Sequence, residues 1–531
     1  MRQPSPARAR TLHGILDDPA PPHAPALVCG RHAWDFGELR ERVEALARGI
    51  AARTAPGDRV AVLAHNRAEY VLAYYAVPRA GRVLVPLNPR LHPAEWAEQL
   101  ARAGARLLLA EGGLAERLPP AESRHSVPRV LFDGPDWDTL LSAPPPPGGF
   151  PPDDPDRPAW LLFTSGSTGR PKGVRLTHRS LLAAVRSTRY GRPVDRDAVF
   201  LTPFPLCHVA GYQVLMHHQA GRPAVVMRRF EPDGLLDLAD RHRVTSLSLA
   251  PTMIDALLDH LAAAPPERTA ALRATVRTIG YGSSPISPRL LRRCVETLDC
   301  DLNQGYGSTE LSGNAVFLGP AEHRAAAADP GAAAGEGRGG LLGAAGRPAP
   351  GVELRIVDPW DEAGLTDRPP GAVGELAVRA EQLCDGYWDD PSATAAAFRS
   401  GWFRTGDLAR IDEAGYLHLT DRKKDVIVTG GENVSAREVE AVLLEHPAVD
   451  RAAVVGVPDP RWGERVCAVL VPVPAPGVPS PDPDELTALC RGRLAGFKVP
   501  RRVVLADALP LTGTGKVAKG VLRERLAAAG D

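Results

Sequence analysis

The 531-residue chain has 44% hydrophobic and 24% charged residues, as an ordinary globular protein does. Its 63 basic residues equal its 63 acidic ones. Proteins that bind nucleic acids or membrane surfaces usually have an excess of basic residues, so this balance argues against both classes. No apolar run approaches the ~20 residues of a membrane span. We therefore expect no membrane span and no secretory signal. Seven scattered cysteines without CxxC pairs fit a cytoplasmic protein.

Helical and strand-like patterns alternate along the first 320 residues. Residues 34–53 have the spacing of an amphipathic helix, and residues 144–158 are too rich in proline for regular structure. A strand followed by a helix is expected within 243–261. Short apolar runs that indicate buried strands occur at 58–64, 81–87 and 159–164. Because strands that alternate with helices form parallel sheets, we expect an α/β fold.

The last third of the chain has a different pattern. The Ala/Gly tract 325–341 is typical of a surface loop, and short β-type runs follow it. Residues 425–531 predict a small α/β unit of domain size, with a helix at 437–449 and strands at 451–457 and 465–473. We therefore predict two domains, residues 1–421 and residues 422–531.

The segment FTSGSTGRPKGVRLTH, residues 163–178, has the composition of a phosphate-binding loop. Glycines permit close approach, and backbone N–H groups, hydroxyls and the Lys172 cation can hold anionic oxygens. The other loop residues in this prediction are Thr164, Ser165, Gly166, Ser167, Thr168 and Gly169. Walker A spacing is absent, because Gly173 follows Lys172, so a flexible turn is an equal alternative. Only six of the 63 basic residues are lysines, which favours a role for Lys172 that arginine cannot fill.

Five motifs, in the same order, resemble the signature of the acyl-adenylate-forming superfamily, which includes acyl-CoA synthetases, luciferases and peptide-synthetase adenylation domains. They are TSGSTGRPKGV (164–174), QGYGSTE (304–310), GWFRTGDLAR (401–410), DRKKDVIVTGGENVSAREVE (421–440) and PLTGTGKVAKG (510–520). The resemblance covers about residues 12 to 528. It implies a large N-terminal domain of α/β sheets with a β-subdomain, and a small mobile α+β C-terminal domain. It also implies ATP and Mg2+, with CoA as co-substrate.

The resemblance implies a nucleotide site drawn from several motifs. Glu310 would bind Mg2+, which prefers oxygen ligands, and Thr309 would contact the α-phosphate. Without the motif, a lone glutamate at a turn is usually a solvated charge. Residues implied in binding the adenine and the ribose are Gly282, Ser283, Tyr306, Gly307, Asp407 and Arg422.

Two lysines in the C-terminal part have different implied roles. Lys516 would be the catalytic lysine that stabilises charge as pyrophosphate leaves. Lys424 would be the hinge about which the small domain swings. After the swing, Gly430 and Gly431 would pass the pantetheine arm of CoA, and Trp462 would meet its nucleotide end. An ordinary β-turn and core packing are the alternatives for these last residues.

The acid-binding region is expected after PFPLCHVAG. By resemblance His208 would gate the carboxylate tunnel, and Val209, Gly211, Tyr212 and Asn314 would shape the acyl pocket. No acidic residue lies between positions 203 and 229, which disfavours an amino-acid substrate. No arginine lies between positions 203 and 221, which weakens the case for a dicarboxylate. An acyl or aryl monocarboxylate is therefore expected.

The expected function is adenylation of a carboxylic acid by ATP with release of pyrophosphate, followed by transfer to the CoA thiol. An alternative acceptor is the phosphopantetheine of a carrier protein that acts in trans. A nucleotide-binding regulator without chemistry is a rival, which intact Lys516, Glu310 and Asp407 argue against. A luciferase-like oxygenase has no support in the residues. We expect no nucleic-acid partner, and a monomer or a homodimer.

Overall fold

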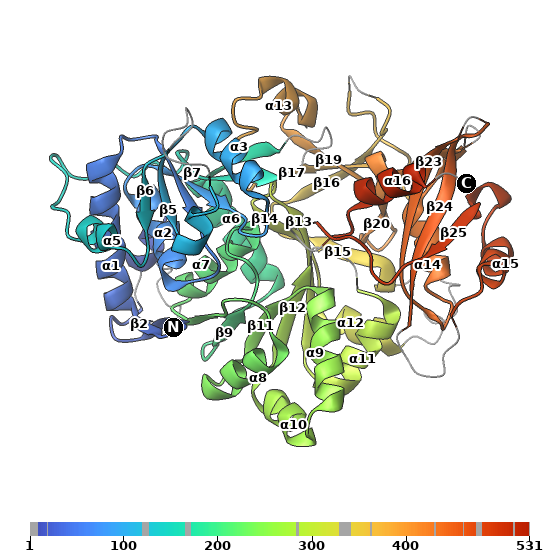
Figure 1. Ribbon diagram of the computed structural model, residues 1–531, viewed down its shortest axis with the longest axis horizontal. Coiled ribbons are helices and arrows are strands. Elements are labelled where there is room, and N and C mark those ends of the chain that lie inside the picture. The colour runs from blue at the N-terminus through green and yellow to red at the C-terminus, as the bar shows by residue number, and fades with distance from the viewer. Residues whose placement is uncertain are drawn as a thin grey trace. The chain divides into compact units, whose positions relative to one another are not determined.

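The computed structural model describes residues 9–17, 20–118, 127–164, 171–282, 286–328, 341–361, 364–429, 432–459, 461–473, 480–512 and 516–529. The chain divides into two compact units (Figure 1). The first unit consists of Met1–Ala332, Gly340–Glu353 and Arg379–Phe403, and the second of Ala333–Gly339, Leu354–Val378 and Arg404–Asp531. The division predicted at residue 421 stays a prediction; the second unit contains the predicted C-terminal domain and segments on its N-terminal side.

The smaller sheet of the first unit has the strand order β6-β5-β3-β4-β7-β8, and it is parallel except for the last pair. Its strands are β3 (Arg59–Leu63), β4 (Val83–Leu87), β5 (Ala105–Ala110), β6 (Arg129–Leu131), β7 (Pro158–Thr164) and β8 (Lys172–Thr177). Helices in this part of the chain are α1 (Phe36–Arg53), α2 (Ala68–Arg79), α3 (Pro93–Ala103), α4 (Gly112–Ala115) and α5 (Pro135–Leu141). A capping box of Asp35 and Glu38 starts α1, which packs on α2 and α5. The predicted strands and helix of this region are confirmed.

The larger sheet of the first unit is parallel from β13 to β1 and antiparallel at both ends. In spatial order its strands are β15 (Ala344–Pro348), β14 (Gly313–Leu318), β13 (Asp301–Ser308), β12 (Thr278–Gly282), β11 (Ser246–Leu249), β9 (Phe200–Thr202), β10 (Ala224–Val226), β1 (Pro25–Cys29) and β2 (His32–Asp35). The predicted α/β class is therefore confirmed.

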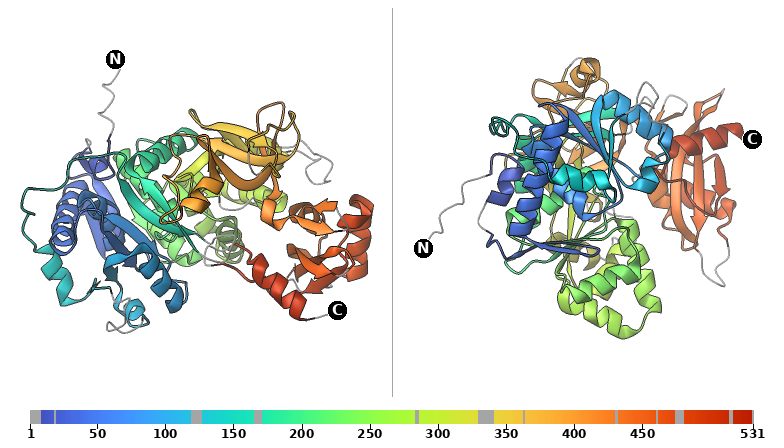
Figure 2. Two further views of the ribbon diagram at one scale, coloured as in Figure 1. Left: turned by 90° about the horizontal axis from the view of Figure 1, so that it is seen from above. Right: turned by 60° about the vertical axis from the view of Figure 1, so that its left-hand side comes forward.

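Helices cover the larger sheet. Four of them, α8 to α11, pack against one another and are drawn in green in Figure 2. The helices that cover the larger sheet are α6 (His178–Gly191), α7 (Tyr212–Gln219), α8 (Pro232–Arg241), α9 (Pro251–Ala263), α10 (Pro266–Thr275), α11 (Pro288–Leu298) and α12 (Pro320–Ala328). A further helix, α13 (Pro391–Ala397), contacts the short strand β18 (Phe398–Arg399). Residues 325–328, predicted as loop, belong to α12, because this alanine-rich stretch has high helix propensity. Tyr74 of α2 packs on Trp160 of β7, and both are fully buried in a core that β1, β9 and β10 share.

The second unit contains a group of four neighbouring strands and the C-terminal α/β part. The first consists of β16 (Glu353–Val357), β17 (Gly374–Arg379), β19 (Trp402–Ile411) and β20 (Leu417–Arg422). The C-terminal sheet has β21 (Ile427–Thr429), β22 (Glu432–Val434), β23 (Val449–Asp459), β24 (Gly463–Pro472) and β25 (Arg502–Leu505). Its helices are α14 (Ala436–Leu443), α15 (Pro483–Arg493) and α16 (Lys519–Ala528).

Strand β23 shows how the C-terminal part forms layers. Val454 packs with α14 and α15, whereas its neighbours Ala453 and Val455 pack with Leu522 of α16. Successive side chains of a strand point to opposite faces, so the sheet has two helices on one face and one on the other. Within the described part of the chain, no helix is both long and apolar enough to cross a membrane.

Candidate active site

The predicted phosphate loop connects the two strands of a β-hairpin. Thr164, the last residue of β7, lies directly opposite Lys172, the first residue of β8. Residues Ser165, Gly166, Ser167, Thr168 and Gly169 lie outside the described residues. The hairpin register therefore brings Thr164 and Lys172, which flank the predicted loop, side by side.

Lys172 and Glu310, 138 positions apart in the chain, both contact Tyr387. The Lys172 Nζ lies 5.0 Å from the centroid of the Tyr387 ring. The Tyr387 hydroxyl donates a hydrogen bond of 3.1 Å to Glu310 Oε1. Burial, and then the negative charge of Glu310, raise the pKa of Tyr387, so this hydroxyl remains a donor at neutral pH. The structure thus brings the predicted phosphate lysine and the predicted magnesium ligand to one tyrosine.

Backbone contacts hold Tyr387 in place. Trp388 N donates to Gly173 O at 2.7 Å, and Tyr387 forms an isolated β-bridge with Val174 of β8. Cys384 N donates to Glu310 O at 2.8 Å. The segment around Tyr387 is therefore fastened to the hairpin on one side and to the turn after β13 on the other. Sequence reasoning missed Tyr387, because no local spacing connects it with either partner.

The residues predicted to bind adenine lie on adjacent strands. Gly282 ends β12 opposite Gly305 of β13, and Tyr306 and Gly307 follow on β13. A side chain at position 307 is excluded, since a Cβ there would lie 1.9 Å from the Gly313 carbonyl oxygen. Thr309 and Glu310 lie in the turn after β13, where Ser312 N donates to Thr309 O at 2.9 Å. Ser283 lies outside the described residues.

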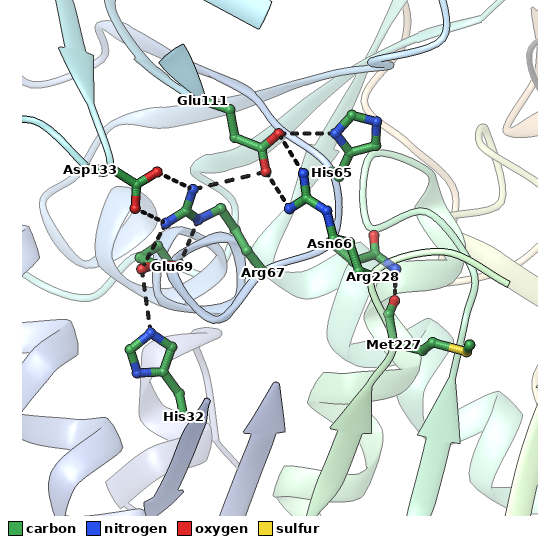
Figure 3. Close-up of polar contacts among 9 residues, drawn as sticks. All are labelled: His32, His65, Asn66, Arg67, Glu69, Glu111, Asp133, Met227 and Arg228. Atoms are coloured by element: carbon green, nitrogen blue, oxygen red, sulfur yellow. Dashed lines mark hydrogen bonds and ion pairs between the residues drawn. The ribbon is translucent and has the colours of Figure 1, made fainter. Parts of the chain in front are cut away.

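The segment that leads to His208 is fixed by the buried Asn66, which Figure 3 shows beside Met227. Asn66 Nδ2 donates to the carbonyl oxygens of Phe204 (2.8 Å) and Met227 (2.9 Å), and Leu206 N donates to Asn66 Oδ1 at 2.8 Å. His208 then starts the short turn Val209–Gly211 that leads into α7. Sequence reasoning missed Asn66, which would affect the position of His208 by holding the segment before it.

An ion-pair network surrounds Asn66 (Figure 3). Its neighbour Arg67 pairs with Glu69 at 2.7 Å and with Asp133 at 3.1 Å. Glu111 pairs with Arg228 at 2.8 Å and with His65 at 2.9 Å. These partners outweigh burial and lower the pKa of Glu111. The network fastens the start of α2 to the strands beside it and so limits the movement of Asn66.

Two residues predicted for the acyl pocket are brought together. The Tyr212 hydroxyl lies 2.7 Å from the Thr188 hydroxyl of α6, and it accepts a 3.3 Å hydrogen bond from Asn314 N. Tyr212 and Asn314 are 102 positions apart in the sequence. Val209 and Gly211 immediately precede Tyr212. Their contact with an acid stays a prediction.

In the second unit, the two residues predicted to bind the ribose form an ion pair. Arg422 Nε lies 2.9 Å from Asp407 Oδ1, because β19 and β20 place these residues directly opposite each other. Gly406, which precedes Asp407 in β19, is held by Glu375, whose Oε1 accepts from Gly406 N at 3.2 Å. Arg404 pairs with the same carboxylate at 2.6 Å, and both of these side chains are buried. Glu375 and Arg404 thus position Asp407, and sequence reasoning did not identify that role.

The structure describes the other predicted C-terminal residues in part. The Lys424 backbone belongs to a short 3-10 helix, Lys423–Asp425, while its side chain, Gly430 and Gly431 lie outside the described set. Lys516 is exposed beside a loop, and its backbone N donates to Thr512 Oγ1 at 3.2 Å.

Trp462 is flanked by two guanidinium groups in the second unit. The Arg501 guanidinium carbon lies 4.3 Å and that of Arg461 5.0 Å from the centre of its ring. Trp462 is partly exposed.

Residues 18–388 match the AMP-binding enzyme family, and residues 438–516 match the family's C-terminal domain. The chain belongs to the AMP-binding enzyme family. The resemblance inferred from the five motifs is thereby confirmed, and so is the predicted class, an AMP-forming ligase that joins an acid to a thiol.

Two relatives and one solved structure illustrate the similarity of this AMP-binding enzyme to known proteins. A feruloyl-CoA synthase of Amycolatopsis sp is 38% identical over 512 residues, 95% of this chain and 96% of that protein. The fatty acid–[acyl-carrier-protein] ligase ScoC of Streptomyces coeruleorubidus is 35% identical over 514 residues, 95% of this chain and 94% of that protein. The Bacillus subtilis O-succinylbenzoate coenzyme A synthetase structure, with ATP and magnesium ion, has a TM-score of 0.80 and 30% identity, covering 98% of this chain and 100% of that one.

Proposed function

We propose that this AMP-binding enzyme converts an acyl or aryl acid, with MgATP, into an acyl-AMP and then transfers the acyl group to the thiol of CoA. The observation that carries the proposal is the arrangement of Lys172, Tyr387 and Glu310. A lysine that could stabilise the leaving pyrophosphate and a carboxylate suited to a metal contact the same tyrosine, which supports the proposal. Glu310 lies in the turn after β13, which also carries Thr309.

Glu310 fits the role of magnesium ligand. Its carboxylate is only partly buried, and the one contact described above is a single hydroxyl donor, which leaves lone pairs for a cation. The described residues contain no cluster of three or more His, Cys, Asp or Glu side chains suited to a metal. A site with the single carboxylate of Glu310 suits Mg2+, which uses one or two carboxylates and takes its other ligands from phosphates and water. The ion would neutralise charge that develops on the pyrophosphate.

The lysines supply the remaining positive charge in the proposed adenylation step. Attack of the acid carboxylate on the α-phosphorus breaks the bond to the pyrophosphate, which leaves with the extra electron pair. Lys172 would stabilise the departing group, and Lys516 would stabilise the charge that develops at the α-phosphate. Lys516→Ala should lower adenylate formation by ~100-fold or more, while thioester formation from preformed acyl-AMP survives. Equal loss of both half-reactions would contradict this role.

The surroundings of Trp462 support CoA as the acceptor. An indole ring can stack on an adenine, and the flanking Arg461 and Arg501 can pair with phosphate oxygens. The 35% identity to an acyl-carrier-protein ligase favours the second candidate, in which a carrier-protein phosphopantetheine accepts the acyl group.

All seven cysteines are free thiols, which supports a reducing, cytoplasmic location.

The deciding experiment supplies the purified full-length chain with ATP, Mg2+ and a panel of carboxylic acids. Acid-dependent pyrophosphate release measures adenylation. The active acid is then offered CoA or a holo carrier protein, and the thioester is measured by mass spectrometry. Thioester on CoA supports the first candidate, and thioester on the carrier protein alone supports the second. A panel that gives no acid-dependent pyrophosphate would overturn both.

A further inference from the structure

Arg192 is a buried guanidinium that has no carboxylate partner among the residues the structure describes. It follows the last residue of α6 and is 8% exposed. In the described structure its Nη2 donates to the carbonyl oxygen of Tyr281, while its Nε, which solvent does not reach, has no hydrogen-bond partner. Burial lowers the pKa of Arg192, and the groups that act in the opposite direction are Tyr212 and Tyr281, with no carboxylate among them.

Two other arginines with buried side chains, Arg82 and Arg404, have more hydrogen-bond partners. Arg82, which is 4% exposed, donates to the Thr54 hydroxyl and to three backbone carbonyl oxygens. Arg404 pairs with the Glu375 carboxylate and also donates to backbone carbonyls. A buried charge without a counter-charge is costly, and hydrogen bonding normally uses all the donors that burial removes from water. Arg192 therefore keeps a buried donor and a positive charge that the described residues do not match.

Two glycines make the space that Arg192 occupies. A Cβ on Gly280 would lie 2.6 Å from Arg192 Nη1, and a Cβ on Gly305 would lie 2.9 Å from Nη2. The same Cβ on Gly305 would lie 2.6 Å from Asn314 Nδ2. Arg192 therefore lies against β12 and β13, next to Asn314 and close to Tyr212, the two residues predicted to shape the acyl pocket. The site that would accept an anion is beside the place expected for the acid.

We propose that Arg192 binds a second carboxylate of the substrate, at the end of the acid remote from the carboxylate that is adenylated. This inference rests on the proposed function and narrows its substrate class to dicarboxylic acids. The monocarboxylate expected from the sequence depended on the absence of arginine between positions 203 and 221, and Arg192 lies outside that window. A guanidinium matches a carboxylate in charge and geometry, and it has donors to spare here.

The test compares matched acids by acid-dependent pyrophosphate release. Octanoate and suberate form an aliphatic pair, and cinnamate and 4-carboxycinnamate form an aromatic pair. The wild-type enzyme should have the higher kcat/KM for the dicarboxylic member of at least one pair. Arg192→Met should lower that value by about 100-fold, mostly through KM, because truncation leaves the second carboxylate buried without its partner. The variant should leave activity with the monocarboxylic member within a few-fold of wild type.

Two further variants keep the test decisive. Arg189→Met removes an exposed arginine from the same helix. It should leave unchanged the ratio of kcat/KM for the dicarboxylic acid to kcat/KM for the monocarboxylic acid. Gly280→Ala should displace the guanidinium and so lower the same ratio of kcat/KM values. If Arg192→Met does not fold, this variant and the wild-type ratio together test the role of Arg192. A wild-type preference for the monocarboxylic member of every pair would overturn the role of Arg192 and leave adenylation intact. No pyrophosphate from any acid would instead overturn the proposed function itself.

Discussion

Tyr387 offers the sharpest test of how the two predicted phosphate-site residues cooperate. Tyr387→Phe removes the hydroxyl that donates to Glu310 at 3.1 Å, and it keeps the ring that lies 5.0 Å from the Lys172 ammonium. A hydrogen bond to a charged group contributes about 1.5 to 3 kcal/mol. Glu310 is partly exposed, so the lower end applies, which corresponds to about a tenfold change.

The assay is pyrophosphate release as a function of MgATP at saturating acid. We expect Tyr387→Phe to lower kcat/KM for MgATP about tenfold, because Glu310 loses the donor that orients its carboxylate. Tyr387→Leu also removes the ring and should lower it about threefold more, through loss of the cation–π contact with Lys172. Thioester formation from preformed acyl-AMP, which involves no pyrophosphate, is the internal control and should not change.

An unchanged dependence on MgATP in Tyr387→Phe would refute the reasoning. Equal losses in adenylation and in thioester formation would also refute it, because they would indicate general damage to the fold. Thermal unfolding of each variant separates these cases, since Tyr387 is only 8% exposed and its ring packs near Phe398.

Three further predictions follow from other contacts. Trp462→Ala should raise the KM for CoA about tenfold, since base stacking contributes ~1–3 kcal/mol; an unchanged KM would exclude this site. Asn66→Ala should lower kcat/KM for the acid about tenfold with little change for MgATP, because it frees the segment before His208; equal changes for both substrates would contradict this. Burial lowers the pKa of His217 and His218 to about 4, so unfolding takes up protons as pH falls below the unfolded value of 6.5. In urea unfolding, each imidazole should therefore lower the free energy of unfolding by about 2 kcal/mol between pH 7 and pH 5. If His217→Phe lost as much stability between these two pH values as the wild type does, His217 would not contribute to the loss.

The sequence predicted the alternation of strands and helices well. Residues 58–64 and 81–87 are β3 and β4, because apolar β-branched runs between turn residues have few other stable arrangements. The helix predicted at 437–449 begins at Ala436 and ends at Leu443. Its second half is not helical, since a proline at 447 interrupts the pattern. Local patterns thus located elements and left their ends uncertain by several residues.

Site residues that belong to short motifs were also accessible from the sequence. Thr164, Lys172, Glu310 and Asp407 stand in short segments whose order and composition identify the family. In contrast, Tyr387, Asn66 and Glu375 act on partners that lie at least 29 positions away, so no local pattern contains them.

The sequence by itself determined the family, the adenylating chemistry and the identity of the charged groups, because these depend on residue types at fixed short spacings. Only the tertiary structure decided which groups share one place. It joined Lys172 to Glu310 through Tyr387, and it placed an unmatched guanidinium, Arg192, beside Asn314. The physical reason is that burial and pairing are properties of contacts between distant segments. The cost of a buried charge without an anion therefore exists only once the chain has folded around it.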